Sequence, residues 1–194
     1  MAAKKSKRAD HTLFSVILEG LETIKGASPD KLFEDKKRVE VITWDAYFDS
    51  FLKDSLVMHF SRNDNNVKEL FDPNRGGPLG SLINKARFAY ALGLIERTTL
   101  KDLKRIHKIR NKFAHSIKIK FADEEIVGYV KSLSTVNESD EVTAKNSYKF
   151  FKSALEKCEE CLHKVVVHEG KKEIRRLKRM KKKKKRAEDV NKQK

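Results

Sequence analysis

Three residues of one short stretch, Arg110, Asn111 and His115, have side chains that could take part in chemistry on a phosphate ester. A histidine can act as a general base on a ribose hydroxyl, while an arginine stabilises the charge that develops around phosphorus. Asn111 could orient the phosphate or the histidine. On an ideal α-helix, five residues correspond to a rotation of about 140°, so Arg110 and His115 do not share a face, whereas Asn111 and His115 do. A joint site therefore requires the helix to end near Ala114, or a second copy of the chain to complete it.

A structural role is an alternative for the same residues. Arg110 lies at the edge of an apolar helical stripe and could form an ion pair with a carboxylate from a neighbouring helix, such as Asp45 or one near Asp102. His115 could then cap the C-terminus of its own helix, where a protonated imidazole is favourable. Recognition of a ligand or of a protein partner is a third possibility for Arg110, Asn111 and His115.

Two cysteines, Cys158 and Cys161, are followed by His163 and His168, a spacing that raises the question of a zinc site. The same segment carries an apolar stripe at helical spacing, made of Phe151, Leu155, Cys158, Leu162 and Val165. Structural zinc sites usually combine two ligand pairs from different elements, and the sequence has no second cysteine pair. We therefore predict reduced thiols on a helix, with no metal site, no disulfide and no cofactor.

The formal net charge of +16 is concentrated at the two ends of the sequence. Residues 169–194 hold 14 Lys and Arg against 4 Asp and Glu, and residues 1–10 hold 4 against 1, so residues 11–168 carry a net charge of only +3. This distribution argues against a core that binds DNA through general basicity. It leaves a basic run that could contact nucleic acid by releasing counterions, or could simply be a solvated tail: Lys181, Lys182, Lys183, Lys184, Lys185 and Arg186.

Apolar residues recur at helical spacing along nearly the whole sequence, which predicts an all-α fold. The expected helices cover residues 11–24, 39–60, 64–71, 82–95, 100–114, 123–133 and 142–167, with a polar connector at residues 30–38. The sequence thus predicts a single-domain helical bundle at residues 11–168. A disordered basic N-terminus would occupy residues 1–10, and a disordered or frayed lysine-rich C-terminal tail would occupy residues 169–194.

The sequence contains neither a run of about 18 apolar residues nor the apolar segment of an export signal. We therefore expect a cytoplasmic protein without membrane association. The clearest loop runs from Asp72 to Pro78 and is dense in turn-forming residues. It brings Pro78 and Gly80 to the start of an apolar helix with Ser81 as the expected N-cap, which makes Pro78 and Gly80 further candidates for ligand or partner binding.

Several motifs in this region, taken in order, resemble those of the mannitol operon repressor family. They are Leu70-Phe71, Pro78 to Leu82, Lys85, Ala89 to Ile95, Asp102-Leu103, Ile109 to Ser116, and Phe121, Asp123 and Ile126. The resemblance covers about residues 40–135. It implies an all-α fold and negative regulation of genes for sugar-alcohol (mannitol) uptake and metabolism.

No helix-turn-helix is evident in the sequence, so we expect a regulator that acts through a protein partner rather than through a DNA-reading helix. Small residues on the helix faces also lead us to expect a homodimer. Any contact with nucleic acid would be weak and made by the tail.

The Arg110-x4-His115 spacing also resembles a motif of the HEPN superfamily, whose members are helical, dimeric domains. Some are metal-independent RNases and others are inactive binding modules. This second resemblance implies the alternative function, a metal-independent endoribonuclease or an inactive RNA-binding descendant, with Arg110, Asn111 and His115 as its site. We predict a non-catalytic regulator and keep the RNase as the alternative.

Overall fold

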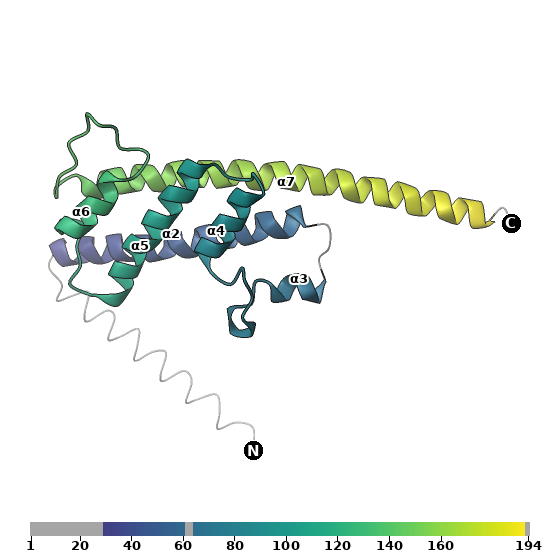
Figure 1. Cartoon of the computed structure of the whole chain (residues 1–194), viewed down its shortest axis with the longest axis horizontal. Coiled ribbons are helices and arrows are strands. Elements are labelled where there is room, and N and C mark those ends of the chain that lie inside the picture. The colour runs from purple at the N-terminus through teal and green to yellow at the C-terminus, as the bar shows by residue number, and fades with distance from the viewer. Residues whose placement is uncertain (1–28, 61–63, 193–194) are drawn as a thin grey trace, which may run out of the picture. The chain divides into compact units, whose positions relative to one another are not determined.

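The computed structural model describes residues 29–60 and 64–192, and every regular element in these ranges is a helix. Their order is α2 (Pro29–His59), α3 (Asn65–Glu69), a short 3-10 helix η1 (Pro73–Arg75), α4 (Leu82–Ala91), α5 (Arg97–His115), α6 (Glu124–Lys131) and α7 (Ser147–Lys192) (Figure 1). The predicted all-α fold is therefore confirmed. The helix expected at residues 11–24 and the N-terminal segment 1–10 lie outside the described residues.

The chain divides into two compact units between Glu40 and Val41. The described part of the first unit is the beginning of α2, where the sequence predicted a polar connector over residues 30–38. That prediction is wrong, because the segment is helical from Pro29 onward. Proline is favoured at the first position of a helix, and an ion pair one turn apart, Lys37 Nζ to Glu34 Oε1 at 2.6 Å, supports the helix that follows.

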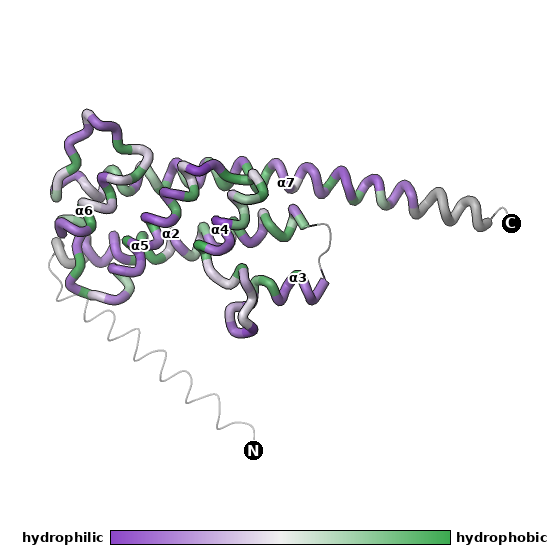
Figure 2. The backbone as a smooth tube through the Cα atoms, in the orientation of Figure 1, coloured by the Kyte–Doolittle hydropathy of each residue, from purple (hydrophilic) through white to green (hydrophobic). Residues whose placement is uncertain are grey.

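The second unit is built around α5, which packs against α4, α6 and α7. The buried face of α5 includes Leu103, Ile106, Ile109 and Phe113, the three- and four-residue spacing that the sequence predicted. Figure 2 shows hydrophobic and hydrophilic residues interspersed along these helices, whereas the coloured part of α7 that precedes its grey end is mostly hydrophilic. The core of this unit therefore comes from matching apolar faces of amphipathic helices.

The part of α2 from Val41 to His59 runs parallel to α7 (Figure 1). Tyr47 Oη donates a hydrogen bond to Glu159 Oε1 at 3.2 Å, and His59 Nδ1 lies 3.0 Å from Glu169 Oε2. Because residue numbers rise together along both helices in these two contacts, the helices point in the same direction. The last helix of the chain thus lies beside an early one.

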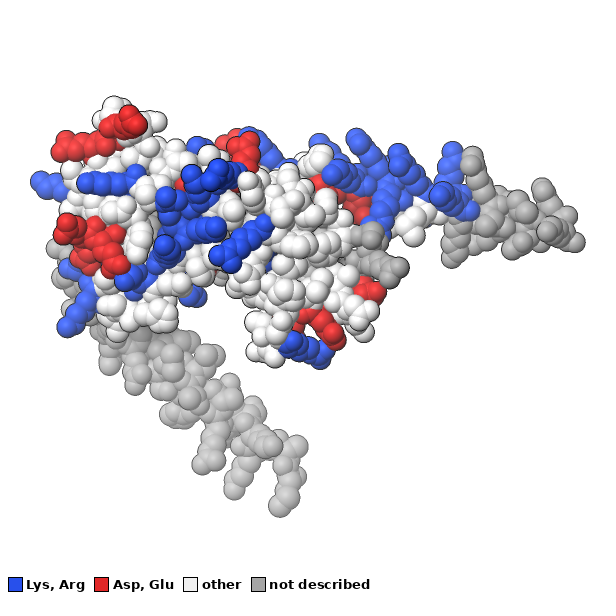
Figure 3. Space-filling model, in the orientation of Figure 1, with Lys and Arg blue, Asp and Glu red and all other residues white. Residues whose placement is uncertain are grey.

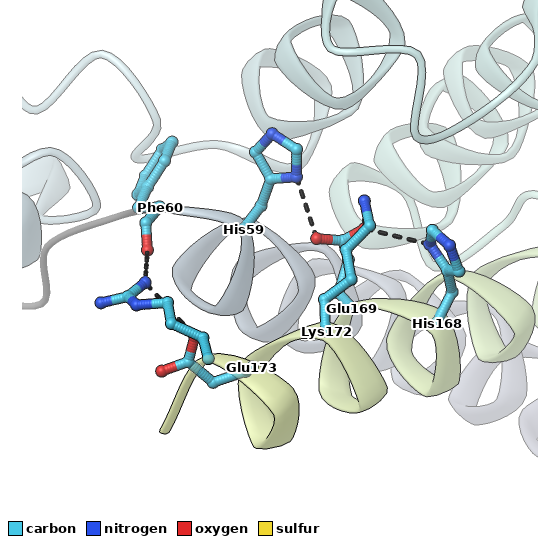
Figure 4. Close-up of polar contacts among 7 residues, drawn as sticks. His59, Phe60, His168, Glu169, Lys172 and Glu173 are labelled. Carbon is cyan, nitrogen blue, oxygen red and sulfur yellow. Dashed lines mark hydrogen bonds and ion pairs between the residues drawn. The ribbon is translucent and has the colours of Figure 1, made fainter. Parts of the chain in front are cut away.

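Glu169 of α7 is a buried carboxylate, with a relative exposure of only 1%. Figure 4 shows the side chains of His59, His168 and Lys172 around it. Its oxygens lie 3.0 Å from His59 Nδ1, 3.1 Å from His168 Nδ1 and 2.9 Å from Lys172 Nζ. Burial by itself raises the pKa of Glu169, but hydrogen bonds from Lys172 and His59 outweigh burial and hold this pKa below its ordinary value. The ionised carboxylate therefore joins α7 to α2.

Helix α4 begins where the sequence predicted and ends earlier. Ser81 is its N-cap, and the Ser81 hydroxyl accepts a backbone N–H of the first turn. Gly93 then adopts a left-handed conformation with φ of 70°. The N–H of Gly93 donates to Tyr90 O at 3.0 Å and that of Leu94 to Ala89 O at 2.9 Å, the paired bonds of a Schellman ending. These bonds end the helix before Ile95, although apolar residues continue to that point.

Helix α7 begins at Ser147, later than the expected start at residue 142, and continues through Lys192, into the segment for which a disordered or frayed tail was expected. Lys181, Lys182 and Lys183 are exposed on this extension. None of the helices in the described ranges combines the length and the apolar composition that a membrane span requires.

Candidate functional site

The predicted site residue Arg110 lies on α5 beside a buried carboxylate of α2. Arg110 Nε is 3.6 Å from Asp45 Oδ2, and His107 Nδ1 is 2.9 Å from Asp45 Oδ1. Asp45 is only 7% exposed, and these two side chains supply polar contacts to its carboxylate. The structure thus contains the ion pair with Asp45 that the sequence offered as one alternative for Arg110.

Arg110 also contacts its neighbour in sequence, because its Nη1 donates a hydrogen bond to Asn111 Oδ1 at 3.1 Å. The Nε of Arg110 is buried without a hydrogen bond, since 3.6 Å is too long for one. The other carboxylate considered for Arg110, Asp102, is occupied elsewhere. It is buried and accepts hydrogen bonds from the Ser134 backbone N–H, at 2.9 Å, and from the Ser134 hydroxyl.

His115 is the last residue of α5 and is exposed. Its ring makes no hydrogen bond or ion pair with another described residue, whereas Arg110 contacts both Asn111 and Asp45. Among the described residues, no hydrogen bond or ion pair joins His115 to Arg110, the predicted base and the predicted charge-stabilising group. His115 does stand at the helix C-terminus, the position in which a cationic imidazole is favourable.

The two other predicted site residues, Pro78 and Gly80, belong to the loop before α4. Pro78 is exposed, and Gly80 is packed so closely on Pro73 that an added Cβ would lie 2.9 Å from the Pro73 Cα. At Gly77 an added Cβ would lie 2.3 Å from Glu69 O. These distances give Gly77 and Gly80 a packing role, because only a residue without a side chain fits there.

A groove of about 590 Å³ opens between α4, α5 and α6. Six of the residues that line it are Arg87, Lys104, Arg105, Lys108, Tyr129 and Ser132. No acidic residue is among the described residues that form its walls. Figure 3 shows Lys and Arg gathering in a band over α5 on this face. The groove therefore presents a concentrated positive charge to solvent.

Two of these cations are held by uncharged partners. Arg105 Nε donates to the Ser132 hydroxyl and Arg105 Nη1 to Lys101 O at 3.3 Å, while Lys108 Nζ lies 5.9 Å from the centre of the Tyr129 ring. A ring at this distance attracts the ammonium without neutralising it. The positions of the two side chains are thus restrained while their charges stay uncompensated.

The other two cations, Arg87 and Lys104, form no hydrogen bond or ion pair with any residue in the described ranges. The carboxylate of Glu125, on α6, is already engaged by Lys112 Nζ at 2.7 Å and by Tyr129 Oη at 3.2 Å. The hydrogen bond from Lys112 lowers the pKa of Glu125, and the same bond raises the pKa of Lys112.

The sequence reasoning did not find this groove, although a signal for it was present. Helix α5 carries seven Lys and Arg but one acidic residue, Asp102, and Asp102 is buried. Adding the charges over residues 11–168 concealed this local excess, because acidic residues of other elements cancelled it. A count made helix by helix would have indicated a basic face.

The two cysteines lie as the helical stripe predicted, with Cys158 buried and Cys161 half-buried. Burial raises the pKa of the Cys158 thiol far above its ordinary value, and Cys161 Sγ accepts a hydrogen bond from Thr99 Oγ1 at 3.3 Å. His163 is exposed. In the part of the chain that the structure describes, His, Cys, Asp and Glu side chains do not gather in groups of three that could hold a metal ion.

Comparison with known proteins tests the resemblance to the mannitol operon repressor family. Among solved structures, the X-ray structure of the MtlR-HPr complex from Escherichia coli is similar to this chain. Sequence identity is 21% and the TM-score is 0.45, over 68% of this chain and 88% of that one. No match is found among curated proteins. The family model of the mannitol repressor, MtlR, matches residues 34–181, most of the sequence. The chain therefore belongs to the mannitol repressor family.

Proposed function

We propose that this protein represses genes for mannitol uptake and metabolism by binding a protein partner, and that it catalyses no reaction. The observation that carries the proposal is the match to the mannitol repressor over residues 34–181. The geometry of the Arg110 stretch supports a non-catalytic role. Arg110 is paired with Asp45, and His115 lies exposed at the end of α5, so a catalytic pair is not assembled within one chain.

A surface suited to a protein partner is present on α4 and the turn that follows. Phe88, Tyr90 and Leu92 are 40%, 43% and 37% exposed, which is unusual for large apolar side chains that lie so close together. Phe88 and Leu92 are four residues apart and therefore share a face. Aromatic residues are enriched at the centres of protein interfaces, where they contribute most of the binding energy.

The solved MtlR-HPr complex makes HPr the first partner to test. The experiment is calorimetric titration of the full chain with purified HPr, beside a reporter gene under a mannitol operon promoter. The test variant, called the α4 variant, carries both Phe88→Ser and Leu92→Ser. The matched control is Ile174→Ser with Leu177→Ser, which removes two exposed apolar side chains from α7.

We expect the α4 variant to lose at least tenfold in affinity and to lose repression, while the α7 control retains both. The proposal fails if the purified chain alone binds operator DNA tightly and independently of salt. It also fails if the chain cleaves single-stranded RNA in EDTA and His115→Ala abolishes the cleavage, because that result would establish the RNase alternative.

We further propose a cytoplasmic homodimer whose tail, from Lys181 to Arg186, makes weak contact with nucleic acid. The exposure of Lys181, Lys182 and Lys183 supports this role for the tail. A truncation after Met180 leaves the buried Glu169 in place and is the appropriate variant. It should lose salt-sensitive nucleic-acid binding without a change in sedimentation coefficient beyond that expected from its mass.

A further inference from the structure

We propose that the groove between α4, α5 and α6 binds a small phosphorylated molecule, a phosphate monoester of a hydroxylated compound. The residues that line the groove do not include Phe88, Tyr90 and Leu92, the exposed apolar residues that we assign to a protein partner. The proposal adds a ligand site to the proposed function and does not require that a particular protein be the partner.

The first argument is the charge of the groove. Arg87, Lys104, Arg105 and Lys108 contribute four positive charges to a space of about 590 Å³ whose described lining holds no carboxylate. Like charges held this close repel one another and raise the free energy of the empty groove. A bound dianion would remove that repulsion, and a phosphate monoester carries close to two negative charges at neutral pH.

The second argument is the arrangement of hydrogen-bond donors. Arg105 is fixed by the Ser132 hydroxyl and the Lys101 carbonyl, so its guanidinium is preorganised. Arg87 and Lys104 have no partner among the described residues and keep all of their donors for a ligand. Arginine guanidinium groups can bind two phosphate oxygens at once, and lysine adds a compact charge.

The third argument concerns the rest of the ligand. His107 also lines the groove, and its Nδ1–H is directed to the Asp45 carboxylate, which leaves Nε2 as the remaining polar atom of the ring. Ile83 and the Tyr129 ring provide apolar wall. The volume falls within the usual range of pockets for small molecules. Cations beside apolar and hydrogen-bonding groups suit a short hydroxylated chain that ends in a phosphate.

The fourth argument separates a small molecule from a nucleic acid. Proteins that bind nucleic acid through phosphates spread their cations along a surface that follows the backbone. Here four cations from two helices line one groove of about 590 Å³, together with Tyr129 of α6 and Ser132, which follows α6. The concentration of charge in one place favours recognition of a single phosphoryl group.

The test is calorimetric titration of the full chain with mannitol 1-phosphate, mannitol, inorganic phosphate and a single-stranded oligonucleotide. The choice of mannitol 1-phosphate as the probe rests on the proposed function, whereas the site does not. The test variant is Arg87→Gln with Lys104→Gln. The matched control is Arg97→Gln with Lys101→Gln, which removes the same charge from exposed positions of α5 outside the groove.

We expect mannitol 1-phosphate to bind, mannitol alone not to bind, and inorganic phosphate to bind at least tenfold more weakly than the ester. The groove variant should lose at least tenfold in affinity and the control less than twofold. Circular dichroism of both variants checks that each is folded.

Three outcomes would overturn the proposal. The ester fails to bind the folded wild-type chain, the two variants lose affinity equally, or only the oligonucleotide binds through the groove. The HPr titration is measured separately, so failure of this site and failure of the partner proposal can be told apart.

Discussion

The ion pair between Lys85 and Asp49 predicts an asymmetric response to mutation. Lys85 of α4 has a relative exposure of 2%, and its Nζ lies 2.6 Å from Asp49 Oδ1 of α2, while the Asp49 side chain is 37% exposed. Replacing Asp49 with Ala leaves a buried ammonium without its partner. Replacing Lys85 with Met removes the buried charge and leaves a carboxylate that water can still reach.

Removal of one partner from a fully buried ion pair costs about 3–5 kcal/mol, and replacement of the buried charge by an apolar side chain is often neutral. Because Asp49 is partly solvated, we discount the first figure and expect Asp49→Ala to lower the free energy of unfolding by about 2–3 kcal/mol. Lys85→Met should change this free energy by less than about 1 kcal/mol.

The assay is urea unfolding followed by circular dichroism at neutral pH, with Asp54→Ala as the matched control. Asp54 is exposed on the same helix, so this variant reports the effect of alanine on helix propensity alone. The double variant of Lys85 and Asp49 should be about as stable as Lys85→Met. If Lys85→Met destabilises the chain as much as Asp49→Ala does, the reasoning from burial is wrong.

Three further predictions follow from the structure. In urea unfolding, Gly77→Ala should lower the free energy of unfolding by more than about 2 kcal/mol, because the added Cβ would lie 2.3 Å from a backbone oxygen. Gly128→Ala should instead raise this free energy by up to about 1 kcal/mol, because its Cβ would meet nothing within 4 Å. The folded-state pKa of Glu169 lies below its ordinary value of 4.5, so its ionised form stabilises the fold above pH 4.5 and this contribution is lost as the pH falls through the lowered pKa. Glu169→Gln should therefore flatten the dependence of stability on pH in the acid range, and an unchanged acid profile would contradict this assignment. Iodoacetamide should label Cys161 faster than Cys158 in the native chain, because burial raises the pKa of the Cys158 thiol. Mass spectrometry measures the two labelling rates, and equal rates would show that Cys158 is accessible.

Elements that depend on local periodicity could be predicted from the sequence. The stripe of α5, from Leu103 to Phe113, is buried as its spacing indicated, and Ser81 caps α4 as its residue type indicated. The end of α4 at Ala91 was missed, because apolar residues continue past Gly93 and the apolar pattern therefore predicted a helix as far as residue 95. The helix over residues 30–38, where a connector was expected, was also missed, since polar residues without an apolar stripe can still be good helix formers.

The candidate site could be predicted only where two residues offered complementary charges. The pair of Arg110 and Asp45 was foreseen as one alternative for that reason, although the choice between Asp45 and Asp102 required the structure. The groove could not be foreseen in the same way. Arg87 and Lys104 lie on different helices, and only the packing of α4 against α5 places them around one space.

The parallel pairing of α2 with α7 has a consequence for the order in which the protein folds. The contacts of Tyr47 with Glu159 and of His59 with Glu169 join residues 112 and 110 positions apart. Contacts this distant in sequence form late and slow the folding of a helical domain, which otherwise folds rapidly through local contacts. On the ribosome, α4 and α5, which contact α2 through Asp49 and Asp45, emerge before α7, but the side of α2 that contacts α7 stays uncovered until residues beyond Glu169 have been synthesised. During the interval between the synthesis of α2 and that of α7, this side of α2 is available for aggregation of the nascent chain.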